Sequence, residues 1–274
     1  MYRGFDLRLE KNDFSREHFG NFYNFGLKCI SNQKNSIIEK LNSFVGENGS
    51  LDGSKMQENW FPQVEADVFI SHSHKDVELA IALAGWLKDT FELTAFIDSC
   101  VWGYSDDLLK QIDNNYCFND KEGSYSYKKR NYSTSHVHMM LSVALTQMID
   151  KAECLFFLNT PNSLTPNPDR NQTESPWIYF EISTSRLIRK KELKEYRFKA
   201  LCKALRSYSS GGALNVKYDL PTDHLVDINT SVLNKWAEMW NNVSLHDDFP
   251  QYSSDLSVHA LDKLYELTKS QHGK

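Results

Sequence analysis

The segment Ala66-Asp-Val-Phe-Ile-Ser-His-Ser-His-Lys-Asp76 is the strongest indication of a fold in this chain. Its apolar run at 67–71 predicts a buried strand, and Asp76 is expected to cap a helix that ends near Phe91. Two further apolar runs, at 94–98 and 154–159, follow with helical stretches between them. Strands that alternate with helices are typical of a parallel sheet with crossover connections. The sequence therefore predicts an α/β fold in which helices flank a mostly parallel central sheet.

The outer parts of the chain are expected to extend this domain. Residues 214–218 and 226–228 are candidates for further strands, and residues 256–267 have the spacing of a C-terminal packing helix. A turn-rich run from Gly46 to Asn59 is typical of a boundary. We therefore expect an N-terminal accessory segment and linker over residues 1–62, and the main domain over residues 63–274.

Charge and cysteine usage limit the classes of partner and compartment. The chain has 274 residues, with 31 basic and 36 acidic residues and a net charge of −5, so nucleic acid and anionic membranes are not expected as general partners. The net charge does not exclude a local basic patch that binds an anion. We expect no secretory signal and no membrane span, because no continuous apolar run is long enough. The five cysteines are scattered, which favours a reducing cytoplasm.

Two further features carry competing interpretations. The pairs His72/His74 and His136/His138 have no evident third ligand, so we predict no metal site. Residues 113–135 place four tyrosines around Lys128-Lys129-Arg130 and are predicted to be an excursion from the core. This excursion is either a solvated insertion or a surface for a base and a phosphate.

The segment Ser175-Pro-Trp-Ile-Tyr-Phe-Glu181-Ile182 predicts a helix that carries a carboxylate one turn from its start. Ser175 is a good N-cap and Pro176 suits the first helical position, so Trp177 and Glu181 are expected to stack at a spacing of four. Glu181 is either a solvated surface residue or a carboxylate at the rim of the sheet.

These segments together resemble the Toll/interleukin-1 receptor (TIR) domains. The run from Ala66 to Asp76 is similar to the first box of that family, and Phe96-Ile-Asp98 is similar to its second strand. The Ser175-x-Trp177-x-x-x-Glu181-Ile182 pattern resembles the segment that carries the catalytic glutamate in NAD-consuming members. The loop from Ser99 lacks the Pro-Gly pair typical of receptors and adaptors, so the chain looks closer to bacterial TIR proteins of antiphage defence.

The resemblance implies a fold, an activity and partners. It implies a flavodoxin-like TIR fold and an enzyme that cleaves the nicotinamide–ribose bond of NAD, with Glu181 as the catalytic residue. NAD is then a substrate, and no cofactor is implied. The product is ADP-ribose or a cyclic or transferred form of it, a signal for a downstream effector in antiviral defence. Self-association through TIR surfaces is also implied.

The physical chemistry of a parallel sheet supports one site. The residues that follow the strands, 71–74, 98–102 and 160–176, are expected to converge, because ligands bind outside the carboxyl ends of such strands. Cleavage of the nicotinamide bond leaves a ribosyl cation, which the carboxylate of Glu181 can stabilise. Candidates for binding the substrate are Ser71, His72, Ser73, Asp98, Trp102 and Trp177.

Most of these candidates have two interpretations. Trp102 either stacks on an aromatic ring of the substrate or anchors the loop, and Trp177 either walls the site or joins the core. His72 either donates a hydrogen bond in the site or is an ordinary loop histidine. Asp98 is a second site carboxylate or a structural acceptor. The backbone N–H groups around Ser73 are candidates to bind pyrophosphate.

Two alternative functions stay open from the sequence. The first is a non-catalytic TIR module whose strand-end loops bind other TIR domains. The second is a nucleoside-processing enzyme on a similar sheet, because fold alone does not define function.

Overall fold

The computed structural model describes residues 1–33, 41–45, 50–102, 105–119, 123–165, 171–197, 218–219, 222–244 and 259–269. Its strands are β1 (Arg3–Arg8), β2 (Val68–Ser71), β3 (Ala95–Phe96), β4 (Phe118–Asn119), β5 (Ser124–Tyr125), β6 (Cys154–Leu158), β7 (Gln172–Thr173), β8 (Tyr218–Asp219) and β9 (Val226–Asn229). Its α-helices are α1 (Arg16–Gln33), α2 (Gly53–Trp60), α3 (Val77–Phe91), α4 (Asp98–Val101), α5 (Ser105–Ile112), α6 (Tyr127–Lys151), α7 (Pro176–Leu187), α8 (Leu193–Arg197), α9 (Thr230–Ser244) and α10 (Ala260–Leu267).

The centre of the molecule is a five-stranded parallel sheet in the order β3-β2-β6-β1-β9. The predicted α/β fold with a central parallel sheet is therefore confirmed, and it is consistent with a flavodoxin-like architecture. The chain first moves outward from β2 to β3 and then returns to β6 on the other side of β2. Such a reversal is the topological switch point at which open α/β sheets bind ligands.

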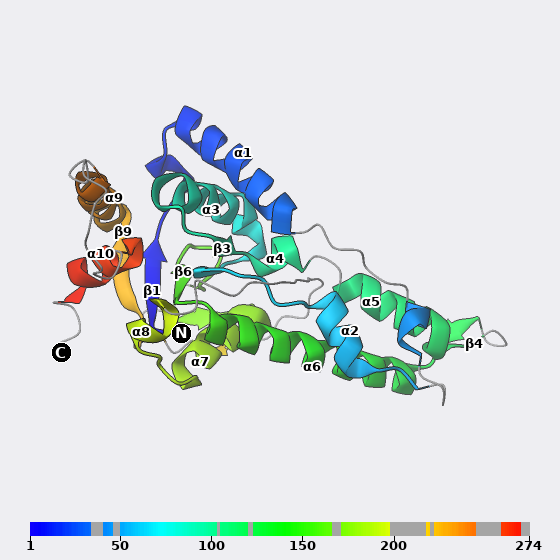
Figure 1. Ribbon diagram of the computed structural model, residues 1–274. Helices are drawn as coiled ribbons and strands as arrows, with labels where there is room; N and C mark the ends of the chain where they lie inside the picture. The colour runs from blue at the N-terminus through cyan, green and yellow to red at the C-terminus, as the bar shows by residue number, and fades with distance from the viewer. Residues whose placement is uncertain are drawn as a thin grey trace.

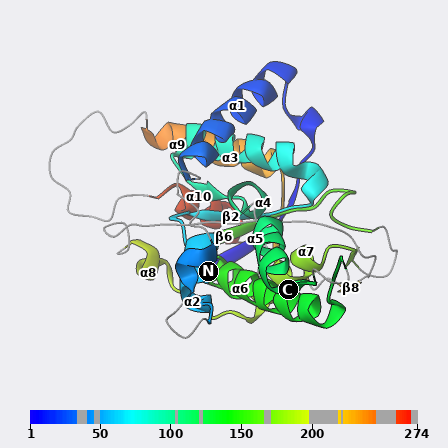
Figure 2. The ribbon, with the colours of Figure 1, turned by 90° about the vertical axis from the view of Figure 1, so that its right-hand side faces the viewer.

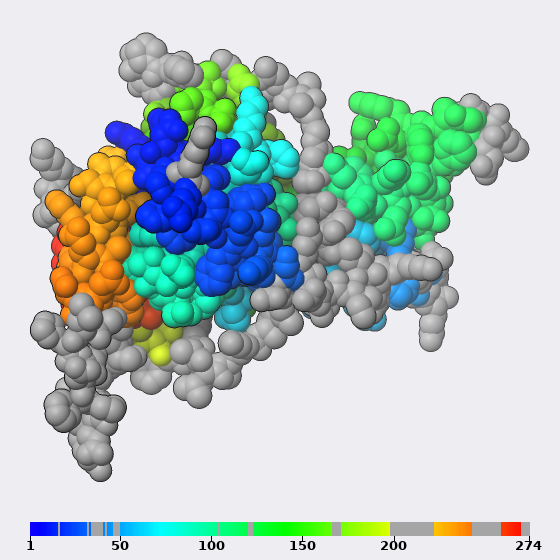
Figure 3. Space-filling model, turned by 90° about the horizontal axis from the view of Figure 1, so that it is seen from above, coloured from blue at the N-terminus to red at the C-terminus, as the bar shows by residue number. Residues whose placement is uncertain are grey.

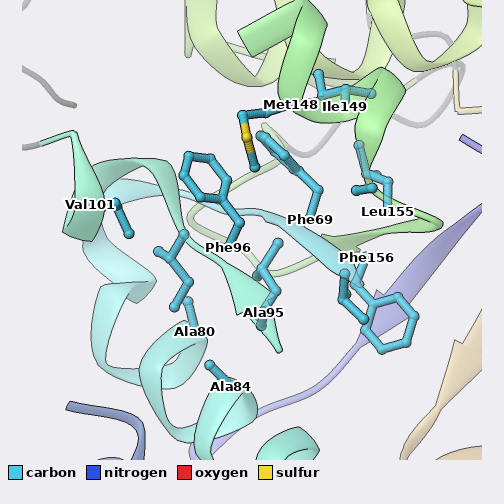
Figure 4. Close-up of a cluster of buried hydrophobic side chains, with 14 of the residues drawn as sticks. Phe69, Ala80, Ala84, Ala95, Phe96, Val101, Met148, Ile149, Leu155 and Phe156 are labelled. Atoms are coloured by element: carbon cyan, nitrogen blue, oxygen red, sulfur yellow. The ribbon is translucent and has the colours of Figure 1, made fainter. Parts of the chain in front are cut away.

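Helices cover both faces of the sheet because successive strand residues point to opposite sides. Phe69 and Leu155 lie toward α6, where Met148 and Ile149 cover them, whereas Phe156 lies on the side of α3 (Figure 4). Helix α3 carries α1 on its outer side, and α6 and α7 lie on the opposite face (Figure 1). The site residues at the ends of β2, β3 and β6 are therefore held by a fully packed sheet.

The N-terminal segment differs from the prediction. β1, which we assigned to an accessory segment, is an inner strand between β6 and β9, with Arg3 beside Cys154 and Phe5 beside Val226. The run predicted as a linker forms α2 over 53–60, after an Asp52 cap that accepts from the backbone of Lys55. Residues 46–49 lie outside the described part. The first strand is thus part of the sheet, in a place that its distance along the chain conceals.

Helices α1 and α3 approach one another at two glycines. A Cβ atom at Gly85 would lie 1.9 Å from the carbonyl oxygen of Phe22, and one at Gly26 would lie 2.1 Å from the carbonyl oxygen of Ile81. Contacts this short leave no room for a side chain. The two glycines therefore allow the backbones of α1 and α3 to meet, and α1 belongs to the helical layer of the domain.

The other predicted elements are found with changed limits. Helices α3, α7 and α10 and strands β2, β3, β6 and β9 occur where the sequence predicts them. The run at 214–218 does not add a strand to the central sheet: β8 pairs antiparallel with β7, and residues 214–217 lie outside the described part. The excursion at 113–135 contains a π-helical turn, η4 (Asp113–Cys117), the β4–β5 hairpin and the start of α6.

Candidate functional site

Helix α7 brings the carboxylate of Glu181 to the carboxyl end of β2. The helix begins as predicted, because the hydroxyl of Ser175 accepts from the N–H of Ile178 at 3.2 Å and Pro176 follows the cap. Two turns of α7 then direct Glu181 toward the sheet, where the hydroxyl of Ser71 donates to its Oε2 at 2.7 Å. Glu181 is 2 % exposed, so it is not the solvated surface residue that a helical glutamate usually is.

The surroundings of Glu181 favour its neutral form. Burial raises the pKa of the Glu181 carboxyl well above its usual range, and the nearby charge of Asp98 raises it further. The hydrogen bond from Ser71 acts in the opposite direction but is the smaller effect. A carboxyl of this kind is a candidate for a functional site, because a buried acid with a like charge beside it is costly to keep.

His72 connects the end of β2 to the turn after β3. Its Nδ1 lies 3.3 Å from the carbonyl oxygen of Ile70 and its Nε2 lies 2.9 Å from the hydroxyl of Ser99. Because a carbonyl oxygen only accepts, the proton belongs on Nδ1, and the hydroxyl of Ser99 then donates to Nε2. Nδ1 also lies 3.8 Å from the carboxylate of Asp98, whose side chain is 24 % exposed. His72 is buried and positions the α4 turn that carries Asp98 beside Glu181.

The loop after β6 is attached to the start of α3 by Asp76. The hydroxyl of Thr160 and the amide of Asn162 donate to the two oxygens of this buried carboxylate at 2.5 and 2.8 Å. Asp76 stands at the N-cap of α3 as predicted, but its side chain makes no capping hydrogen bond. Ser73 has that role one turn earlier, where its hydroxyl accepts weakly from the N–H of Lys75 at 3.4 Å.

The two tryptophans proposed for the site lie in packed surroundings. Trp102 is fully buried, with its ring edge-on to Phe61 at 6.0 Å and to Phe96 at 4.9 Å between centroids. In the structure Trp102 therefore anchors the loop by packing, which is the second of its two interpretations. Trp177 is half-buried and meets the ring of His138 on α6 edge-on at 5.7 Å. Neither indole is among the groups that bond to Glu181.

Two polar residues near these strand ends, Ser99 and Asp6, were not predicted from the sequence. Ser99 orients His72, and its only signal is its place directly after Asp98. Asp6 is a buried carboxylate on β1 that accepts from the amide of Asn159 at 2.8 and 3.1 Å, and burial raises its pKa. The available signal for Asp6 was an acidic residue between the apolar Phe5 and Leu7, in a strand whose other charged residues, Arg3 and Arg8, are basic.

Metal and membrane chemistry find no support within the described residues. No group of three or more His, Cys, Asp or Glu side chains there has the arrangement of a metal site. The paired histidines diverge, since His136 contacts Tyr132 and His138 contacts Trp177 on a helix rather than a strand. Among the helices that the structure describes, none has both the length and the apolar content for crossing a bilayer.

Comparison with known proteins adds no relative. Neither protein-family models, nor curated proteins, nor solved structures match this chain. The residues around Glu181 are therefore the main indication of function. The buried carboxyl of Glu181 can donate a proton when it is neutral and can stabilise a cation when it is ionised. It lies beside a second carboxylate, Asp98, and the hydroxyl of Ser71, at the switch point of the sheet.

Proposed function

We propose that the protein is a TIR-type enzyme that cleaves the nicotinamide–ribose bond of NAD. The observation that carries this proposal is the buried Glu181–Ser71 pair at the carboxyl end of β2. The strand order reverses at that point, so the pair lies where open α/β sheets bind their ligands. The resemblance of the segment from Ser175 to Ile182 to the catalytic segment of NAD-consuming TIR domains supports the same residue.

The chemistry requires a carboxylate near the anomeric carbon. The bond between C1 of the ribose and the pyridinium nitrogen breaks, the electron pair leaves with neutral nicotinamide, and the ribose retains a positive charge. A fixed negative charge in a desolvated site stabilises this cation better than water does. Removal of one such preorganised group typically costs about 10² to 10³ in kcat. Glu181 has this role in the proposal, and Ser71 holds its carboxylate in place.

The burial of Glu181 gives the proposed reaction two requirements. Because Glu181 is 2 % exposed, the dinucleotide has to displace part of what covers the carboxylate before it reaches it. The neutral acid that burial favours also has to ionise. The positive pyridinium drives that ionisation, and the proton leaves to solvent. Asp98, at the more exposed edge, is placed to meet a cationic substrate first.

The product depends on the group that attacks the ribosyl cation. Water yields ADP-ribose, whereas a nucleophile of the same molecule yields a cyclic isomer and another acceptor yields a transfer product. The proposal includes use of this product as a signal to a downstream effector in bacterial antiviral defence, in the cytoplasm and with self-association through TIR surfaces.

Nicotinamide release by purified protein tests the proposal. The protein is incubated with NAD, and the products are separated by liquid chromatography and identified by mass spectrometry. Glu181→Gln is expected to lower the rate by about 10² or more. The matched control is Glu238→Gln, which removes an exposed carboxylate from α9 and is expected to leave the rate unchanged. Equal rates for Glu181→Gln and the unaltered protein would refute the catalytic role.

The complete burial of Glu181 also fits a second candidate, a non-catalytic interaction module in which this acid is structural. That module predicts no release of nicotinamide and a self-association, measured by light scattering, that does not depend on NAD. Deoxynucleosides offered in place of NAD test the nucleoside-processing alternative.

A further inference from the structure

An extended arm projects from the domain at the end opposite α9 and α10. It consists of α5, η4, the β4–β5 hairpin and α6 as far as Val143, that is residues 105–119 and 123–143 (Figure 1). Figure 2 shows α5 and the start of α6 at the same end of the molecule, below the layer of α1 and α3. The arm is the green segment at one end of Figure 3. Its distal part lies far from the residues that bond to Glu181.

Exposed aromatic rings gather on this arm. Among the described residues, the large aromatic side chains with the highest exposure are Tyr127 at 80 % and Tyr132 at 70 %. Tyr125, Phe118 and Tyr116 follow at 43, 42 and 41 %. The phenol of Tyr125 donates to Asn114 at 2.5 Å and its ring meets Phe118 edge-on, so the hairpin presents these rings in a defined arrangement.

The start of α6 on this arm is positively charged. Lys128, Lys129 and Arg130 occupy the first turn of α6, where acidic residues are the usual choice because the helix dipole is positive there. From Tyr127 to Ile149 the helix contains no Asp or Glu. Arg130 is paired with Asp113 at 2.7 Å, whereas neither lysine forms an ion pair with any residue of the described ranges. Within the described ranges, two lysines are therefore available to an external anion.

One exposed ring and one lysine of the arm share a stripe of α6. Lys128, Tyr132 and His136 follow at a spacing of four residues, and Met139 continues the line. All four are exposed, and the His136 ring supports Tyr132 edge-on at 4.4 Å. From Lys128 to Met139 the eleven residue steps of the helix extend over about 16 Å, close to the length of about five stacked nucleotides.

We propose that this arm binds a short single-stranded nucleic acid. Along this stripe a base stacks on Tyr132 and a phosphate contacts Lys128, while Tyr127 and Lys129 flank the stripe at the start of the helix; stacking beside a positive charge is the usual chemistry of sequence-tolerant single-strand binding. The net charge of −5 keeps the rest of the surface unfavourable for a long duplex, so the positive stripe selects a short strand. The proposal corresponds to the second interpretation of residues 113–135, a surface for a base and a phosphate. Binding at this surface does not depend on the activity of Glu181.

Fluorescence anisotropy with the full-length protein tests the proposal. The probes are labelled oligothymidylate and oligouridylate of about 15 nucleotides, which distinguish DNA from RNA, and a duplex of equal length. Tyr132→Ala is expected to weaken binding about tenfold, and Tyr132→Phe, which keeps the ring, is expected to restore it. Lys128→Gln with Lys129→Gln is expected to reduce the slope of log affinity against log salt by about 1.4.

Exposed residues of α1 provide matched controls. Phe25→Ala removes a ring that is 37 % exposed and Lys28→Gln removes an exposed charge, both away from the arm, and both are expected to leave the affinity unchanged. Circular dichroism verifies that each variant is folded, which is expected because Tyr132 is 70 % exposed.

Three results would overturn the proposal. The first is the absence of saturable binding to either single strand. The second is an affinity that Tyr132→Ala does not change, which leaves only charge attraction. The third is preference for vesicles of anionic phospholipid, or for a second copy of the chain, over the oligonucleotides through the same residues. Nicotinamide release is measured separately, so failure of this proposal is distinct from failure of the proposed enzyme.

Discussion

Replacement of Glu181 by Gln should stabilise the protein, and the gain should grow with pH. The carboxyl is 2 % exposed, accepts from Ser71 and lies near the charge of Asp98, so its pKa in the folded protein is well above the usual value. In the unfolded chain it titrates near 4.3. Between these two pKa values the folded state holds one more proton than the unfolded state. The free energy of unfolding therefore falls by about 1.4 kcal/mol for each pH unit gained.

The sign of this effect is opposite to that of a salt-bridged carboxylate. Below about pH 4 both states are protonated and the penalty is absent, whereas above the folded pKa the penalty reaches a constant value. Glutamine has nearly the shape of the neutral acid and keeps an acceptor for Ser71, but it carries no proton to lose. All other titrating groups are shared, so they cancel to first order when the two proteins are compared at each pH.

Urea unfolding at about pH 5, 6 and 7 measures the difference. The advantage of Glu181→Gln is expected to increase by about 1.4 kcal/mol per unit until the folded pKa is passed. Glu238→Gln, an exposed control on α9, should show a small difference that does not vary with pH. Parallel curves for Glu181→Gln and the unaltered protein would show that the buried carboxyl has an ordinary pKa, and the reasoning would then be wrong.

Three further predictions concern the contact between α1 and α3, the ion pair of Glu153 with Arg197, and the proposed reaction. Gly85→Ala places a Cβ where the carbonyl oxygen of Phe22 stands 1.9 Å away, so it should destabilise by about 1 to 3 kcal/mol despite the better helix propensity of alanine, measured as a lower urea midpoint. Glu153→Gln removes the buried charge that pairs with Arg197 and one of the two oxygens that accept from its guanidinium, which also bonds Asp262 of α10, and it should cost about 3 kcal/mol. Hydrogen exchange should then be fastest in α10, and unchanged exchange there would contradict this role. In the proposed reaction, kcat/KM should rise about tenfold per pH unit below the raised pKa of Glu181, because only the ionised carboxylate stabilises the cation. A flat profile of nicotinamide release against pH would contradict it.

The fold could be predicted where its cause is local. The strands β2, β3 and β6 are short apolar runs between turn residues. The start of α7 is indicated by the N-cap Ser175 and by Pro176 at the first helical position. The place of β1 has no local cause, because its pairing joins Arg3 to Cys154 across the length of the chain. Sequence patterns identify such a strand but not its neighbours.

Helix α1 and the first turns of α6 were missed for a related reason. On α1 the decisive feature is Gly26, which weakens helix propensity but permits the contact with Gly85. On α6 the residues from Tyr127 are polar, and the helix is marked there by the buried line of Ser133, Val137 and Leu141 at a spacing of four. Because the first buried residue of this line, Ser133, is polar, the sequence shows no apolar helical periodicity there.

The candidate site was predictable as a location but not in its contacts. The convergence of strand ends follows from topology, and Ser71, His72 and Asp98 do lie around Glu181 in the structure. Trp102 shows the limit, since a loop tryptophan is equally suited to a ligand and to the core, and only its packing against Phe96 decides.

The choice of residue at position 181 separates a structural role from a catalytic one. A purely structural group there needs to accept from Ser71 and fill the space, and glutamine does both without an ionisable proton. The acid instead carries a stability penalty through the range in which its folded form holds a proton that the unfolded form has lost. Such a penalty is typical of groups retained for function rather than for stability. A buried carboxyl beside Asp98, at the reversal of the strand order, is therefore better explained by a cation that arrives from outside than by the packing of α7.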